Sequence, residues 1–187
     1  MANIYPAPTN HITTTDPTTG ESTFHSSLTP PPFIDPLPSF RVHYIYSTTS
    51  SPAGGPPIKD DEDLKNYKGI AAKPKVHFPT AGGTGGCLVH FPPNREQTKG
   101  AMHTTSTLDY IFIVDGTMEL GMASGETRIL KKGDSAVQRA TMHWWRNTSR
   151  TEPAMMAVVS VGIEGAVEDE MRIVGVPGEG EGKEKGE

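Results

Sequence analysis

Apolar and polar side chains alternate in short runs through the middle of the chain, and residues that favour turns separate these runs. In residues 108–114, LDYIFIV, the side chains of Asp109, Ile111 and Ile113 share one face, as alternation requires of a half-buried strand. The same pattern predicts strands at 11–15, 22–26, 40–47, 87–91, 108–114, 118–123, 127–131, 135–139, 143–147 and 154–161. Short strands at such close spacing predict an all-β fold, either a sandwich or a barrel.

One helix is predicted, at residues 58–69, IKDDEDLKNYKG. Its acidic residues come first and its lysines last, which suits the helix dipole, and Gly69 is a suitable C-terminal stop. We expect this segment to form a surface connection, or alternatively part of a lid near the mouth of a barrel.

The first two strands, 11–15 and 22–26, are joined by turn residues in DPTTGE and predict a β-hairpin. Both of its faces are polar, and a two-stranded hairpin of this kind is only marginally stable alone. We therefore expect the hairpin to pack on an edge strand, either of its own chain or of a partner.

Composition divides the chain into three regions. At 187 residues it has room for one domain with a single sizeable core. Residues 1–35, rich in Thr, Pro and Ser, predict an N-terminal arm that packs on the core domain or on a partner, and residues 36–165 predict the core domain itself. Residues 166–187 are rich in Gly and Glu and end in PGEGEGKEKGE, which predicts a disordered acidic tail.

Charge and cysteine usage exclude several classes of function. The net charge is -5 and the basic residues form no stripe, so no nucleic-acid partner is expected. The single cysteine, Cys87, rules out an internal disulfide and fits a reducing compartment. No apolar run is long enough to span a membrane and the first residues do not resemble a signal peptide, so we expect a cytoplasmic protein without membrane contact.

Two histidines and a carboxylate stand out against this background. His103 and Asp109 lie six residues apart at the start of an apolar strand, and His143 lies among large apolar side chains in ATMHWWRN. In a small barrel, inward-facing residues of neighbouring strands approach one another around a cavity, so these three side chains can converge. Each alone is compatible with a satisfied polar residue, whereas the three together favour a functional site.

The segments MHTTSTLDY and KKGDSAVQRATMHWWRN resemble the two sequence motifs of the cupin superfamily. In the first motif, His103 matches the first histidine, Thr105 stands in place of the second, and Asp109 stands in place of the glutamate. In the second motif, His143 and Asn147 match, although the spacing before His143 is one residue short. The resemblance implies a conical antiparallel β-barrel of the jelly-roll type and a homodimer with swapped or paired edge strands. It is strongest to small fungal and bacterial members, several of which belong to polyketide biosynthetic pathways, where they process, dehydrate or isomerise ring systems.

The same three residues permit two kinds of chemistry. Two imidazoles and a carboxylate with open positions suit one divalent transition metal, Fe, Zn or Mn, held by His103, Asp109 and His143. Without a metal, His103 and His143 would act as general acid and base, and Asp109 would fix the tautomer of an imidazole. Because Asp109 is one methylene shorter than glutamate, its reach to a metal is the weaker part of the first hypothesis.

Other residues are candidates for contacts with a substrate. Trp145 shares a face with His143 and is expected to line the cavity, and Ile111 shares a face with Asp109 and is expected to form an aliphatic wall. Either Gln138 or Arg139 should face inward and hold a substrate oxygen, and alternation alone does not choose between them. Thr105, at the position of the missing histidine, completes the set.

These residues predict an enzyme that acts on a small, apolar, oxygenated metabolite by dehydration or isomerisation, which is lyase or isomerase chemistry. A polyketide-like substrate is what the family resemblance implies. A metal-dependent oxidoreductase on the same three residues is the alternative within the enzyme class. A cupin that only binds a ligand is the alternative outside it.

Overall fold

The structure is a computed structural model that describes residues 5–6, 8–25, 34–37, 40–52, 54–72 and 77–175. Its strands are β1 (Thr13–Thr15), β2 (Ser22–Phe24), β3 (Ile34–Leu37), β4 (Phe40–Thr48), β5 (Thr84–Phe91), β6 (Met102–Thr105), β7 (Thr107–Asp115), β8 (Thr117–Met122), β9 (Thr127–Lys131), β10 (Ser135–Arg139), β11 (His143–Asn147), β12 (Ala154–Gly162) and β13 (Met171–Gly175). Its helical segments are η1 (Lys59–Asp61) and α1 (Glu62–Ala71).

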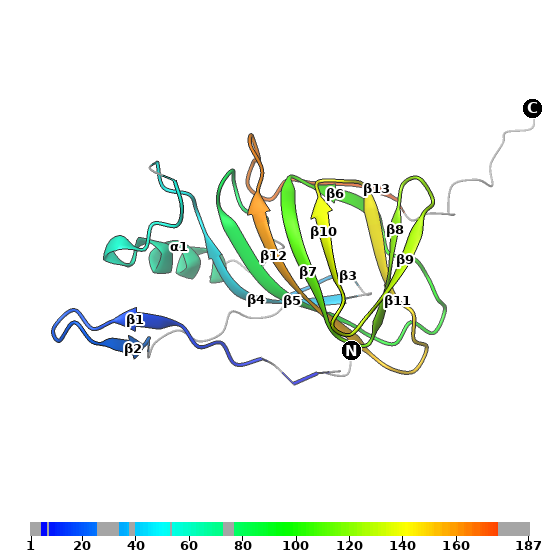
Figure 1. The fold of residues 1–187 in the computed structure, drawn as a ribbon, viewed down its shortest axis with the longest axis horizontal. Coiled ribbons are helices and arrows are strands. Elements are labelled where there is room, and N and C mark those ends of the chain that lie inside the picture. The colour runs from blue at the N-terminus through cyan, green and yellow to red at the C-terminus, as the bar shows by residue number, and fades with distance from the viewer. Residues whose placement is uncertain are drawn as a thin grey trace, which may run out of the picture.

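Two antiparallel sheets form the barrel (Figure 1). The larger sheet has the strand order β10-β7-β12-β5-β4-β3, and the smaller sheet has the order β13-β6-β11-β8-β9. Side chains of both sheets, such as Val89 and Ile111 from the larger and Trp145 from the smaller, meet in one hydrophobic core. The predicted all-β antiparallel barrel is confirmed.

Alternation positions the residues of β7 as predicted. Asp109, Ile111 and Ile113 are buried, whereas Tyr110 and Phe112 between them are exposed. The strand ends at a tight turn because Gly116 has φ +75°, and a Cβ there would lie only 2.7 Å from the Cβ of Ala154. Glycine is the residue that tolerates both this backbone conformation and this close approach.

Three strands were not predicted: β3, β6 and β13. The sequence of β6, MHTT, has no alternation of apolar and polar residues, and the strand exists through its pairing with β11 and β13. Strand β13 lies within residues 166–187, where a disordered tail was expected. Its register with β6 instead makes residues 171–175 part of the smaller sheet, and residues 176–187 lie outside the described part of the chain.

The helix begins later and ends later than predicted. Helix α1 passes through Gly69 and ends at Ala71. Leu64 and Tyr67 are buried, and the ring of Tyr67 lies 4.6 Å from that of Tyr46 on β4. The helix therefore packs against the edge of the larger sheet, as a surface connection, and none of its described residues lines the cavity described below.

The N-terminal arm contains the predicted hairpin, in which Thr13 of β1 pairs with Phe24 of β2. Two side chains anchor the arm to the larger sheet: Asn10 donates to the backbone oxygen of Ile45, and the Tyr5 hydroxyl donates to Oδ2 of Asp115 at 3.1 Å. The hairpin projects beyond the sheet (Figure 1). In the described part of the chain, no helix is long and apolar enough to cross a membrane.

Candidate functional site

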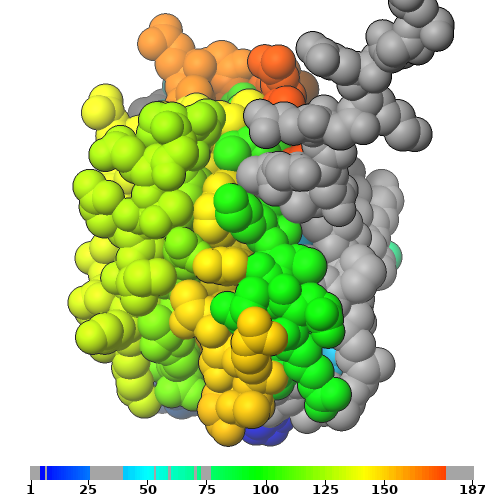
Figure 2. All heavy atoms as spheres, turned by 90° about the vertical axis from the view of Figure 1, so that its right-hand side faces the viewer, coloured from blue at the N-terminus to red at the C-terminus, as the bar shows by residue number. Residues whose placement is uncertain are grey.

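A cavity of about 790 Å³ lies between the two sheets. Its wall on the larger sheet is mostly apolar and includes Val42, Val89 and Met156, while His103 and His143 come from the smaller sheet. At one end the connection 92–101 closes the cavity, and its residues hydrogen-bond to β11 and the residues that follow it, for example from the Gly100 nitrogen to the Trp145 oxygen at 3.1 Å. Figure 2 shows this end, where the green 92–101 segment lies beside the yellow β11 region.

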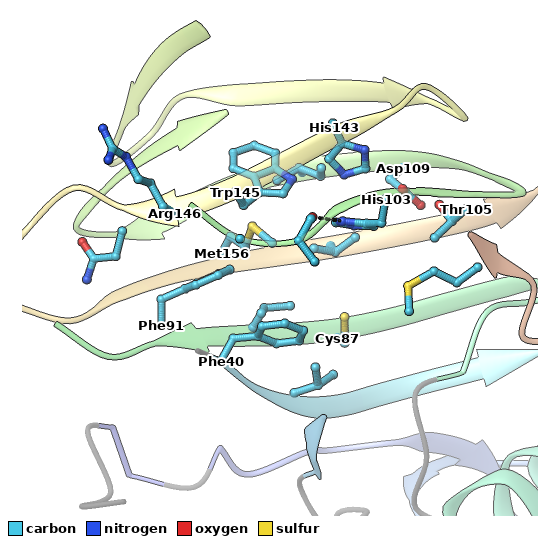
Figure 3. A pocket seen from close by; sticks show the side chains of 18 of the residues that line it. Phe40, Cys87, Phe91, His103, Thr105, Asp109, His143, Trp145, Arg146 and Met156 are labelled. Carbon is cyan, nitrogen blue, oxygen red and sulfur yellow. Dashed lines mark hydrogen bonds between the residues drawn. The ribbon is translucent and has the colours of Figure 1, made fainter. Parts of the chain in front are cut away.

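His103 and His143 face each other across β6 and β11, where they are direct register partners. Their ring centroids are 4.3 Å apart (Figure 3). Each Nδ1 lies close to a backbone carbonyl oxygen two residues earlier, that of Ala101 at 2.9 Å and that of Thr141 at 2.8 Å. A carbonyl oxygen only accepts, so each Nδ1 carries the hydrogen and each Nε2 presents a lone pair.

The environment keeps His143 neutral. Burial, and to a smaller degree the neighbouring His103, lowers its pKa to about 4, while the hydrogen bond to Thr141 acts in the opposite direction. At neutral pH the imidazole of His143 is therefore unprotonated at Nε2, which is the form that accepts a proton or binds a metal.

Asp109 of β7 lines the same cavity from the larger sheet and is 7% exposed. Its Oδ1 is buried without a hydrogen-bond partner. Burial raises the pKa of this carboxyl, against the smaller lowering effects of hydrogen bonds from Ser160 and Thr107 and of the charge of His103. A carboxyl in such surroundings favours its protonated form more than an exposed aspartate does.

Three of the predicted substrate-contacting residues, Thr105, Ile111 and Trp145, line the cavity. Gln138 is 3% exposed, but its amide donates to the backbone oxygen of Thr141 and it does not border the cavity. Arg139 is exposed and does not border the cavity either. Alternation therefore turns Gln138 inward, where it holds the loop that leads to His143.

Cys87 also lines the cavity. Burial, and to a smaller degree the charge of Asp109, raises the pKa of its thiol to about 12. The thiol thus stays protonated at neutral pH, and because the thiolate is the nucleophilic form, Cys87 is not a nucleophile here.

One polar group of the cavity was missed in the sequence. His77 lines the cavity, and its Nδ1 lies 3.0 Å from Oδ1 of Asp169. With Glu168 these residues form the one group of three His, Cys, Asp or Glu side chains in the described ranges whose ligand atoms lie within 4.8 Å of one another. The ligand atoms of His103, Asp109 and His143 are more widely spread. No local pattern could have revealed the pair, because 92 residues separate its members.

The comparisons with known proteins agree with the fold. A family model described as the cupin domain matches residues 87–161. Phomopsin biosynthesis cluster protein C' of Diaporthe leptostromiformis is 33% identical over 159 residues, which are 81% of this chain and 77% of that protein. The cupin-domain-containing oxidoreductase srdB of Neurospora crassa is 36% identical over 114 residues, 60% of this chain and 52% of that protein.

Among solved structures, a cupin-like protein from Thermotoga maritima matches with a TM-score of 0.46 and 14% identity, over 73% of this chain and 77% of that one. The family model falls on the strands that carry Asp109 and His143. Together with the long match to the phomopsin cluster protein, it establishes that the chain belongs to the cupin superfamily and is related to proteins of fungal biosynthetic clusters.

Proposed function

We propose that the protein is an enzyme that transfers protons on a small, apolar, oxygenated metabolite, in a dehydration or an isomerisation. One observation carries this proposal: His143 and Asp109 face the same cavity and have pKa values displaced in opposite directions. Burial lowers the pKa of His143 and raises that of Asp109. Such a pair combines a neutral base with a carboxyl that keeps its proton to a higher pH than an exposed aspartate, which is the combination that acid–base catalysis needs.

In a dehydration, His143 would take a proton from a carbon atom next to a carbonyl group. The electron pair of that C–H bond would form a C=C bond as the neighbouring C–O bond breaks, and Asp109 would give its proton to the departing hydroxyl to form water. In an isomerisation, the proton would instead be returned to a different carbon. The ring of His103 lies beside that of His143, with centroids 4.3 Å apart, so it would help to hold the proton that His143 has taken.

The wall of the cavity supports an apolar substrate of moderate size. Val42, Val89, Ile111, Met156 and Val158 line it, and the ring of Trp145 stands edge-on to His143 with centroids 6.4 Å apart. Apolar walls with a few convergent polar groups are the usual form of a small-molecule site. The printed names of the relatives, which refer to fungal biosynthetic clusters, support a secondary metabolite, and a polyketide-like compound remains the proposed class.

The test is a solvent-exchange assay with the metabolites of the source organism's own biosynthetic cluster. Purified protein is incubated in D₂O with extract from a strain that lacks this gene, and mass spectrometry follows each compound. Loss of one water, or gain of deuterium at carbon, is expected with wild type and not with His143→Asn, which removes the base that both reactions need. A matched control is Arg139→Gln, at an exposed position outside the cavity, which should behave as wild type. A product that has gained oxygen or lost two hydrogens would contradict the proposal.

A metal-dependent oxidoreductase is the second candidate, and a different observation favours it. Both histidines have Nδ1 committed to a backbone carbonyl, which leaves both Nε2 atoms free to bind an ion, and Oδ1 of Asp109 is buried without a partner. These donor types are the ones a divalent transition metal prefers, with His103, His143 and Asp109 as its ligands, but their ligand atoms are not all within 4.8 Å of one another and would have to move closer to hold one ion. A bound metal would supply Lewis-acid or redox chemistry.

Metal content separates the two candidates. The protein is purified without chelator or nickel resin, and wild type and His143→Ala are analysed for Fe, Zn and Mn. A near-stoichiometric metal that the variant lacks would support the oxidoreductase. Metal-free wild-type protein that still exchanges protons would support the acid–base mechanism.

A further inference from the structure

We propose that His77 and Asp169 form a second polar contact point in the cavity, where Nε2 of His77 accepts a hydrogen bond from a hydroxyl group of the ligand. Asp169 acts on the ligand only through His77, as a positioning residue. The inference rests on the proposed function in one respect: the ligand that it describes is the substrate of the proposed reaction. It adds that this substrate carries a hydroxyl group at a point away from the histidine pair.

The structure holds His77 at both its backbone and its ring. Its backbone nitrogen donates to the hydroxyl of Tyr44 at 2.5 Å, and its ring Nδ1 lies 3.0 Å from Oδ1 of Asp169. The side chain is 5% exposed, and His77, Phe78 and Tyr44 all line the cavity. Because the ring has few alternative positions, its Nε2 points in a fixed direction. The loss of side-chain entropy when a ligand binds is therefore small.

Asp169 is held as firmly. Its Oδ1 accepts from the backbone nitrogen of Phe78 at 3.1 Å, and its own nitrogen donates to the oxygen of Phe78 at 3.0 Å. Its φ is +61°, in the left-handed region that residues other than glycine seldom adopt. Backbone strain of this kind persists where the surrounding contacts fix a residue, and it gathers at functional sites.

The tautomer of His77 follows from this arrangement. A carboxylate oxygen accepts hydrogen bonds, so Nδ1 of His77 carries the hydrogen and Nε2 has the lone pair. The polar contacts of His77 are all made through Nδ1 or the backbone nitrogen, so Nε2 is available to a ligand. A hydroxyl group of a ligand can donate its hydrogen to that lone pair.

The carboxylates beside His77 favour a neutral group of the ligand over an anionic one. Besides Asp169, the carboxylate of Glu168 lies 3.7 Å from Nδ1. The neighbouring cavity wall is apolar, with Phe78 and Met171, which suits a hydroxyl carried by a ring.

The sheet places this contact point along the same cavity as the histidine pair but away from it. Ile173 of β13 pairs with His103, Met171 pairs with Thr105, and Asp169 lies two residues before Met171. His77 therefore stands at the end of the cavity where β13 begins. A ligand whose reacting carbon lies at His143 would extend towards His77 with its hydroxyl group.

The test compares the binding of 2-naphthol and 2-methoxynaphthalene to the full chain, followed by quenching of probe fluorescence. The two probes differ in the hydrogen that His77 would accept. Wild type should prefer the naphthol by about tenfold, which corresponds to one well-formed hydrogen bond in a buried site. His77→Asn keeps an amide near the position of Nδ1 for Asp169 and removes Nε2, so the preference should disappear. Three results would overturn the proposal. Wild type could show no preference for 2-naphthol, the preference could persist in His77→Asn, or both probes could fail to bind.

Asp169→Asn tests the positioning role. Asparagine tolerates the left-handed backbone and keeps an acceptor oxygen, so the variant removes the charge with little cost to the fold. Nitrogen NMR of the His77 ring should show hydrogen on Nδ1 in wild type and a mixture of tautomers in the variant. Hydrogen on Nε2 in wild type would overturn the proposal, as would stoichiometric binding of Zn²⁺ that depends on His77.

Failure of the proposed function would look different. If His143→Asn and wild type alike catalyse no proton transfer, the proposed function fails, yet the naphthol preference and its loss in His77→Asn would still establish the contact point. If proton transfer depends on His143 while the naphthol preference is absent, the proposed function stands and the contact point is overturned.

Discussion

The barrel carries two pairs of histidines that share one titration feature and differ in position. His103 and His143 have ring centroids 4.3 Å apart, and His43 and His90, on β4 and β5, have centroids 4.6 Å apart. In each pair burial, and to a smaller degree the other imidazole, lowers the pKa of one member, His143 or His90, to about 4. By pKa alone, both pairs are candidates for a functional site.

Their surroundings separate them. His103 and His143 line the cavity, whereas His43 and His90 do not. His90 instead lies under the N-terminal arm, with the ring of Tyr5 edge-on at 5.0 Å, and its Nε2 is buried without a hydrogen-bond partner. A lowered pKa therefore reports burial, and only access to a cavity makes it useful for chemistry. We call these the cavity pair and the arm pair.

The largest expected difference between the pairs is in turnover. His143→Asn keeps an amide for the carbonyl of Thr141 and removes the base, so kcat should fall by about 10²- to 10⁴-fold, as for the loss of a general base. His90→Asn should leave kcat unchanged. Rates in the proton-transfer assay, with circular dichroism to verify folding, check this. Equal losses in the two variants would mean that the cavity pair has no special role.

The next effect is on acid stability. His143 has a folded pKa of about 4, below the unfolded value of 6.5, so the unfolded chain binds the proton first. The contribution of His143 to the free energy of unfolding is fully present above pH 6.5 and is lost as the pH falls towards 4. The total loss over this range is about 3 kcal/mol. Urea denaturation of wild type between about pH 7 and pH 4 should show this loss.

His143→Asn and His90→Asn should each flatten that dependence, because the pKa of His90 is lowered in the same direction. The two changes should be similar in size, because both side chains are 4% exposed and both pKa values are lowered to about 4. A pH profile that neither variant alters would show that neither imidazole is held neutral by the fold.

Asp109 should have the opposite effect on stability. Its pKa is raised in the folded state, so its contribution is fully present below the unfolded value of 3.8 and is lost as the pH rises through the folded value. Asp109→Asn should therefore raise the melting temperature at neutral pH while it abolishes proton donation. Differential scanning calorimetry of the two proteins measures the change, and a lower melting temperature would contradict a buried, unfavourable carboxylate.

The smallest effect should come from the arm. Tyr5→Ala removes the ring that covers His90 and the hydrogen bond to Asp115, so the pKa of His90 should move up towards 6.5 without any change in kcat. The expected loss in stability is about 1 kcal/mol. Proton NMR of the His90 ring against pH provides the measurement. A loss of turnover would show that the two pairs are coupled across the sheet.

The sequence predicted the strands whose burial alternates and missed those that depend on a partner. Strands β7 and β9 to β12 follow the predicted ranges closely, and in β7 and β12 this is because one face is apolar. MHTT of β6 and MRIVG of β13 have no such contrast, and pairing between them across the sheet creates both. Propensity and alternation are local, whereas this pairing is not.

The candidate site was likewise predictable only where local sequence patterns position its residues. Motif spacing identified His103, Asp109 and His143 because these residues lie on or beside strands of strong pattern. It could not decide between Gln138 and Arg139, since that choice depends on the Thr141 loop that binds the Gln138 amide. The pairing of His77 with Asp169 is a purely tertiary contact, which no spacing rule anticipates.

Strand β13 has a practical consequence for anyone who shortens this protein. The low-complexity appearance of the C-terminal region invites truncation at residue 166, to improve expression or crystal growth. Such a truncation would strip away the neighbour of His103, uncover the edge of β6 and delete Asp169 with it. A cut placed after Gly175 would keep all three, and it lies about ten residues beyond the place that composition suggests.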